Sequence, residues 1–155
     1  MCDWTPVRNW LIVVLITVVA AAGIIVGAAI ANGSIVYAWQ SPIGMAAAAV
    51  ATGLAVIFCT LAVNALDTFL ACAGSRCKGA YDNLRNTINA ARVVLGIQGL
   101  ACLMAALIAW IPIAPQPLMW AIIGALLVQV ALIAAAFGFF VPLTTCQTAP
   151  TPPAG

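Results

Sequence analysis

Four long apolar runs constrain this chain more than any other feature of its sequence. Each run holds about 20 residues or more, enough at 1.5 Å of rise per residue to cross a hydrocarbon core of about 30 Å. Uninterrupted runs favour helices, because a spanning helix satisfies its backbone hydrogen bonds internally. We therefore expect an all-α protein, an integral membrane four-helix bundle with antiparallel neighbours. The expected spans are 10–31, 43–73, 80–111 (including an inner helical extension) and 118–141.

The composition excludes most alternatives to a membrane protein. Hydrophobic residues make up 66% of the chain and charged residues only 5%, whereas a soluble domain carries about 25% charged residues. The net charge of +2 is too small to indicate a nucleic-acid partner. We expect one domain over residues 1–147 and a disordered, proline- and threonine-rich tail over 148–155. The first run exceeds the 7 to 15 apolar residues of a typical secretory signal, which favours a retained span.

The cations predict the orientation of the spans. Arg8 precedes the first run, and the other cations flank the connection between the second and third runs: Arg76, Lys78, Arg85 and Arg92. The remaining connections carry no charge. By the positive-inside rule, the charged connection and both termini should lie in the cytoplasm. The expected location is a cell membrane, and the bacterial inner membrane in particular.

The sequence predicts the structure of two of the connections between the runs. Pro112, Pro115 and Pro117 should form a short, stiff turn that makes the third and fourth spans antiparallel neighbours. The segment 79–89 is amphipathic at helical spacing, which predicts a helix projecting into the cytoplasm. Its polar side chains are a candidate interaction surface, and the alternative is a solvated helix end with arginines near lipid phosphates. That surface comprises Arg76, Lys78, Asp82, Arg85, Asn89 and Arg92.

Small residues within the spans predict close helix packing. Gly23, Gly27, Gly53 and Gly138 each belong to a step of two small residues four positions apart. Such steps let two helix backbones approach closely. Contacts within the chain explain them as well as self-association does.

Polar side chains inside the spans are the best functional candidates, because an unpaired polar group is costly in hydrocarbon. Asn64 and Gln98 should lie roughly 10 and 13 Å from the inner membrane edge, and Gln129 roughly 16 Å from the outer edge. Joined by Thr60, they would form a midplane polar cluster that either ties helices together or lines a polar pathway. Near the inner edge, the carboxylate of Asp67 should pair with Arg92 or Arg85 as a membrane-edge ion pair.

Six cysteines raise a redox or metal hypothesis. Cys2, Cys72, Cys77 and Cys146 fall at the predicted cytoplasmic surface, where four thiolates would suit zinc. No CxxC pair is present, so we expect no metal and no cofactor. In the reducing cytoplasm, free thiols are the simplest expectation, with lipidation as an alternative. The remaining two, Cys59 and Cys102, should be small apolar core residues.

The sequence contains no catalytic constellation, which favours a non-enzymatic protein. We expect an accessory subunit, or an interaction or protective protein, that acts through helix packing with other membrane proteins. Its partners would be the lipid bilayer and either other membrane proteins or further copies of the chain, with no nucleic acid. A channel or carrier for a small neutral or hydrophobic solute is one alternative. A membrane thiol or metal-binding protein is the second.

Overall fold

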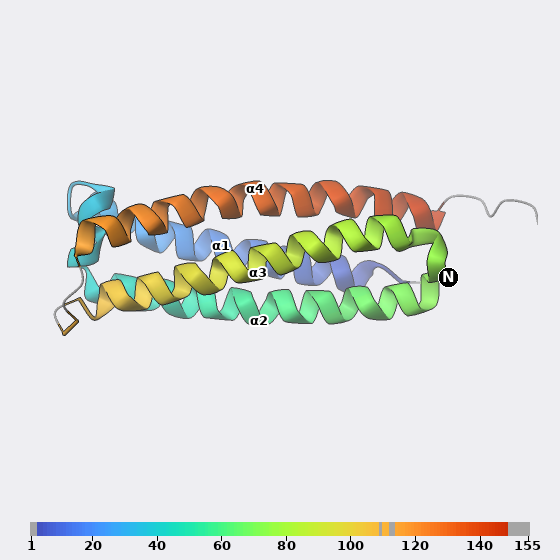
Figure 1. Ribbon diagram of the computed structural model, residues 1–155, viewed down its shortest axis with the longest axis horizontal. Coiled ribbons are helices and arrows are strands. Elements are labelled where there is room, and N and C mark those ends of the chain that lie inside the picture. The colour runs from blue at the N-terminus through green and yellow to red at the C-terminus, as the bar shows by residue number, and fades with distance from the viewer. Residues whose placement is uncertain (1–2, 109, 112–113, 149–155) are drawn as a thin grey trace, which may run out of the picture.

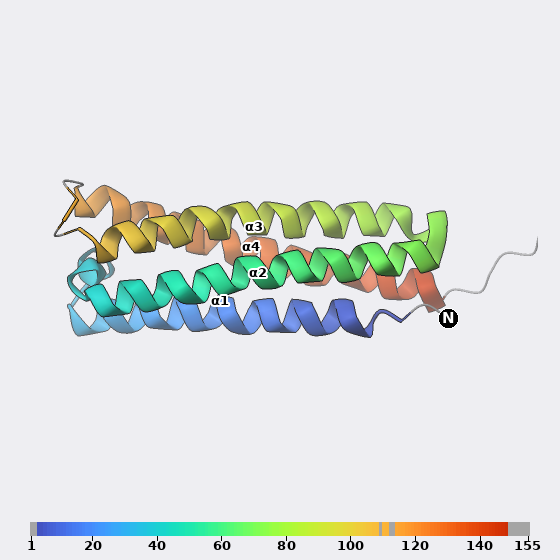
Figure 2. The ribbon, with the colours of Figure 1, turned by 90° about the horizontal axis from the view of Figure 1, so that it is seen from below.

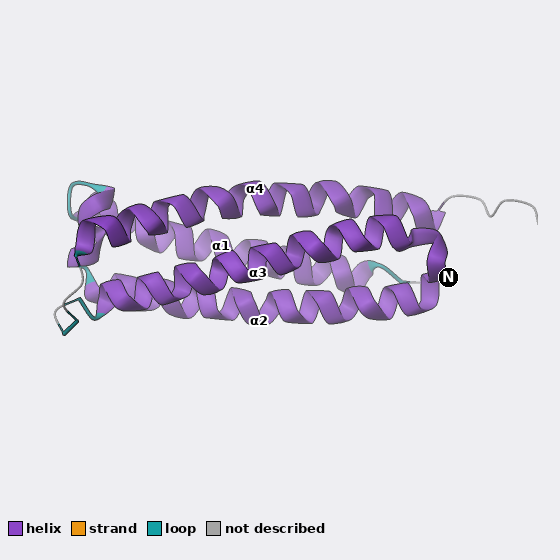
Figure 3. Ribbon diagram, viewed as in Figure 1, coloured by secondary structure: helices purple, strands orange, loops and turns teal. Residues whose placement is uncertain are grey.

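The computed structural model describes residues 3–108, 110–111 and 114–148, except for the side chains of 75–76 and 147–148. Within these residues all regular structure is helical, as predicted (Figure 3). The long helices are α1 (Thr5–Ala31), α2 (Pro42–Ala73), α3 (Lys78–Ala106) and α4 (Pro115–Thr148). The short 3-10 helices η1 (Ile35–Gln40) and η2 (Gly74–Cys77) join α1 to α2 and α2 to α3. The predicted tail lies outside the described residues beyond Thr148.

The helix ends differ from the predicted spans. The described helix α3 stops at Ala106, before the predicted end of the third span. Pro115 and Pro117, predicted to lie in the connection, instead form the first turn of α4. That prediction was wrong because proline is tolerated in a first turn, where its missing N–H has no intrahelical partner to lose.

At the start of α1, the backbone N–H of Thr5 donates to Asp3 Oδ1 at 2.9 Å, and hydrogen bonds from the Thr5 side chain and backbone lower the pKa of Asp3.

The helices form an elongated bundle in which each helix packs against the next one in the sequence, running in the opposite direction (Figures 1 and 2). By contrast, α1 and α4 contact each other only slightly. One end, called the charged end, holds the start of α1, η2 and the end of α4. The opposite, uncharged end holds η1 and the connection from α3 to α4. All four helices are long and apolar enough to cross a membrane.

The interior consists of two apolar clusters stacked along the bundle. One lies toward the charged end and includes Leu66 and Leu84, and the other lies toward the uncharged end and includes Met45 and Ile122. Between them lie the three buried polar side chains of the described residues: Thr52, Gln98 and Gln129. These three residues are called the polar layer.

Candidate functional site

The polar layer joins α3 and α4 across the middle of the bundle. Gln129 Nε2 donates a hydrogen bond to Gln98 Oε1, and the two residues are 1% and 0% exposed. The other two amide atoms, Gln98 Nε2 and Gln129 Oε1, have no hydrogen-bond partner among the described residues. Thr52 is satisfied within its own helix, because its hydroxyl donates to the Ala48 carbonyl at 2.7 Å. Two of the four amide atoms of Gln98 and Gln129 are therefore hydrogen-bonded within the described residues, and the layer is closed to the surface.

The predicted four-residue midplane cluster is only partly assembled. Gln98 and Gln129 meet as expected, but Asn64 is exposed on α2 and contributes its backbone carbonyl to Thr68. Thr60 accepts a hydrogen bond from Arg92 Nη1 at 3.3 Å and lies outside the layer. In its place the layer contains Thr52, which sequence reasoning missed. The available signal was a hydroxyl well inside the second apolar run.

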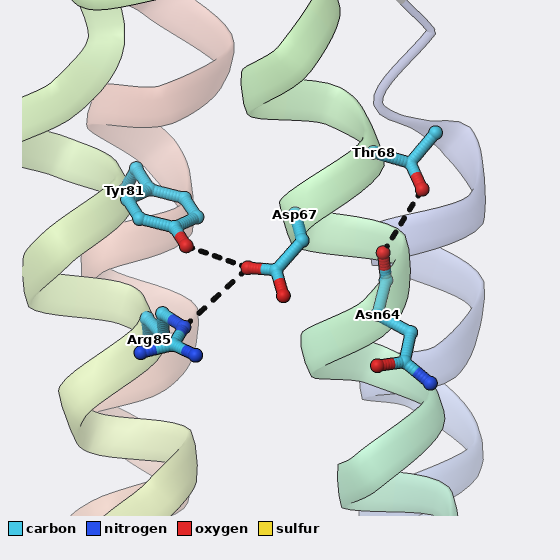
Figure 4. Close-up of polar contacts among 5 residues, drawn as sticks. All are labelled: Asn64, Asp67, Thr68, Tyr81 and Arg85. Atoms are coloured by element: carbon cyan, nitrogen blue, oxygen red, sulfur yellow. Dashed lines mark hydrogen bonds and ion pairs between the residues drawn. The ribbon is translucent and has the colours of Figure 1, made fainter.

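Asp67 pairs with Arg85, one of the two arginines expected, and not with Arg92. Arg85 Nε lies 3.4 Å from Asp67 Oδ1, and the Tyr81 hydroxyl donates to the same oxygen at 2.5 Å. Figure 4 shows Asp67 extending from α2 toward both side chains on α3, while Asn64 does not approach them. Arg92 is one to two turns too far along α3 to share this carboxylate and contacts Thr60 instead.

The predicted interaction surface is not an open patch of free charges. Lys78 lies 4.0 Å from Asp82 in an exposed pair, and Arg85 and Arg92 are engaged with α2, as described above. Asn89 is half-buried and its Oδ1 has no described partner. The side chain of Arg76 lies outside the described residues. The charges on α3 thus serve largely to hold α3 against α2.

An apolar groove of about 430 Å³ opens on the outer surface between α2 and α3. Half of its lining residues are small, including Ala49 and Gly53 on α2 and Gly96 and Gly99 on α3, and these small residues are called its floor. A Cβ added at Gly53 or Gly96 would meet no atom within 4 Å. The described side chains therefore leave the groove unfilled, because the glycines that line it have no side chain to occupy it.

No protein-family model, curated protein or solved structure matches this chain. The assignment of a function therefore rests on the residues themselves.

The glycines predicted to pack helices together all face outward. Gly23 and Gly27 on α1, Gly53 on α2 and Gly138 on α4 each leave open space around an added Cβ. Packing within the chain was one of two explanations for these small-residue steps. The described part of the structure offers no neighbour for an added Cβ at these positions.

The cysteines correct one expectation and support another. Cys59 and Cys102 are free and buried, as predicted for small apolar core residues. Cys77 and Cys146, expected as free thiols, form a disulfide with Cα atoms 5.8 Å apart. Cys72 is also disulfide-bonded, and Cys2 lies outside the described residues. The expectation failed because it relied on a reducing compartment and could not foresee that the fold brings η2 and α4 together.

The described residues also contain no group of three or more metal-ligating side chains.

Proposed function

We propose that this chain is an integral membrane protein that crosses the bilayer with all four long helices. The length and apolar composition of the helices support this. Large apolar side chains also cover the outer surface: Ile16, Val93 and Val130 are each more than 60% exposed. Such a surface is unfavourable in water and ordinary in lipid.

The tryptophans give the proposed depth of the bundle in the bilayer. Trp110 and Trp120 are 85% and 62% exposed near the uncharged end, a position that suits the membrane interface. We measure a hydrocarbon core of about 30 Å from the level of these tryptophans toward the charged end. The helices α2, α3 and α4 are longer than this core is thick, so about 10 to 20 Å of each helix projects beyond it at the charged end. Asp67 and Arg85 then fall beside the headgroups, and Gln98 and Gln129 lie inside the hydrocarbon.

Within that bilayer we propose a non-enzymatic accessory role: the chain binds one transmembrane helix of another membrane protein in the groove between α2 and α3. The unfilled groove is the observation that carries this proposal. It is apolar, lies at hydrocarbon depth and has a glycine- and alanine-rich floor that allows a partner backbone to approach closely. A lipid chain can cover a smooth apolar surface as well as a protein helix can. A floor of small residues favours a helix, because it allows the two helix backbones to approach closely.

The burial of the polar layer supports this role over that of a channel or carrier. A polar pathway needs side chains that face a continuous water-accessible route. Gln98 and Gln129 have almost no accessible surface and are packed between two apolar clusters. Their amides fit interhelical hydrogen bonding, which is the common use of such residues in membrane bundles.

The proposed location is a cell membrane, and in a bacterium the inner membrane. The four helical spans support this location. The cations at the charged end are the argument for placing that end in the cytoplasm. The disulfide at the same end is the argument against it.

Filling the groove tests the proposed role. Gly53→Leu with Gly96→Leu should leave the bundle folded, because both glycines face open space, and should abolish binding. The matched control is Gly124→Leu on α4, which also meets no neighbour and lies outside the groove. Gentle extraction from native membranes should yield one stoichiometric membrane partner with the wild type and the control, and none with the groove variant. Retention of that partner by the groove variant would refute the role.

A further inference from the structure

The cysteines of the described chain sort by their position in the bundle. At the charged end, Cys72, Cys77 and Cys146 are all disulfide-bonded. Inside the bundle, Cys59 and Cys102 are both free. Thiols that stay reduced in the interior and are oxidised at one surface indicate that this surface meets an oxidising solvent.

We infer that the charged end of the bundle, with the start of α1 and the end of α4, faces an oxidising compartment outside the cytoplasm, where Cys77–Cys146 is a permanent structural cross-link. Disulfides persist in the periplasm, the lumen of the secretory pathway and the cell exterior, and are rare in the cytosol. The inference reverses the orientation that the cations alone predict. It concerns the side of the membrane and is independent of the groove.

The packing of this disulfide favours a structural bond over a redox switch, because Cys77 is buried and Cys146 is half-buried. Cys77 is only 2% exposed and belongs to the apolar cluster of the charged end, against which Cys146 also packs. Thiol–disulfide exchange needs access of a thiolate to one of the two sulfur atoms. A bond packed into a core is poorly placed to be opened and closed repeatedly.

The bond also connects elements that are far apart in the sequence. It links η2, between α2 and α3, to the last turns of α4 across a sequence separation of 69 residues. The start of α1 is held nearby by an edge-to-face contact of Trp4 with Phe140 on α4, with ring centroids 5.7 Å apart. These two contacts hold the helix ends together in the part of the bundle that projects beyond the bilayer.

The placement of the cations has a local explanation that does not depend on the cytoplasm. Charges of both signs occupy this half of the bundle, because Asp3, Asp67 and Asp82 lie there together with all five cations. Most of the described cations have a partner: Lys78 has Asp82, Arg85 has Asp67, and Arg92 has Thr60. The Arg8 guanidinium lies 5.3 Å from the centroid of the Trp4 ring. Apart from Arg92, which lies deeper along α3, these residues form a polar end that projects from the membrane, and the net charge of the chain is only +2.

The oxidation balances without any group held by this chain. Joining Cys77 to Cys146 removes one proton from each thiol and two electrons in all. A protein disulfide of the oxidising compartment accepts both electrons and both protons by thiol–disulfide exchange and becomes a dithiol.

Two reporter cysteines test the orientation. Asn83→Cys on α3 and Gln40→Cys at the end of η1 place exposed thiols at the charged and uncharged ends, respectively. Cells stripped of any outer envelope are treated with a membrane-impermeant maleimide before and after permeabilisation. The Asn83→Cys variant should react in intact cells, and the Gln40→Cys variant only after permeabilisation. The opposite pattern overturns the inference.

Trapping thiols in living cells tests the oxidation. Cells are quenched with acid, denatured and treated with a polymer-linked maleimide, comparing wild type with Cys77→Ser plus Cys146→Ser. Both proteins should carry the same number of adducts before reduction, and the wild type should gain two more than the variant after reduction. A wild type that already carries two extra adducts before reduction, or that binds a metal through these thiols, overturns the inference.

Discussion

Gln129 on α4 donates a hydrogen bond to Gln98 on α3 at the level where the two apolar clusters of the bundle meet. The pair is closed to solvent and leaves one amide nitrogen and one amide oxygen without a partner among the described residues. In a membrane bundle, such a bond contributes about 0.6 kcal/mol on average and up to about 1.7 kcal/mol. It also fixes the register of α3 against α4, because a shift of one helix along the other would part the two amides.

A double-mutant cycle on this pair should show coupling. Gln98→Leu or Gln129→Leu alone leaves the other amide buried without its partner, so each should lower the free energy of unfolding by about 1 kcal/mol. The double variant should lose less than the sum, because no polar group remains unpaired. Unfolding in bicelles or mild detergent measures all four proteins. Strictly additive losses would show that the amides do not interact.

The same double variant separates a structural role from a transport role. Its helices should remain folded and its partner bound, since neither Gln98 nor Gln129 lines the groove. Flux assays in liposomes provide the readout for the alternative. A folded double variant that loses solute flux shown by the wild type would favour a channel.

The ion pair at the charged end should be specific for one arginine. A cycle with Asp67→Asn and Arg85→Gln should give a coupling energy of about 0.5 kcal/mol, because both side chains are nearly half exposed and solvent screens them. The matched cycle with Asp67→Asn and Arg92→Gln should give no coupling. Equal coupling in both cycles would mean that the carboxylate is shared between the two arginines.

Loss of the cross-link should destabilise the bundle substantially. A loop of about 70 residues predicts a stabilisation of about 4 kcal/mol from restricting the unfolded chain. Cys146→Ser should therefore lower the Tm of the purified protein, and a reductant strong enough to open the wild-type bond should lower it by at least as much, because it also opens the bond of Cys72. Cys102→Ser serves as the control, because reductant should affect that variant as it affects the wild type. A Tm unchanged by Cys146→Ser would show that the charged end holds together without the bond.

The sequence predicts the helices well because hydropathy and length alone decide whether a segment spans a membrane. It predicts their rotation poorly. In a lipid-facing helix both the core side and the outer side are apolar, so nothing in the second run shows that Thr52 faces inward and Asn64 outward. Counting residues gives only depth along a helix, which is why Gln98 and Gln129 were expected at a similar level.

The sequence also could not predict which residues far apart in the chain pair with each other. Arg85 and Arg92 both lie near Asp67 in depth, and only the rotation of α3 selects Arg85. Cys77 and Cys146 are far apart in the chain, and an expected cytoplasmic location argued against any bond. The groove was also hidden, because a small-residue step is the same in sequence whether it is filled by the chain's own helices or left open.

Site-specific photocrosslinking in native membranes tests the proposed role most directly. A crosslinking side chain at Gly53 lies in the groove, and one at Val130 lies on the exposed face of α4. The proposed role predicts that the probe at Gly53 captures a transmembrane segment of one membrane protein, that Gly96→Leu abolishes this product, and that the probe at Val130 does not form it. A probe at Gly53 that captures only lipid, or the same products as the probe at Val130, would contradict it.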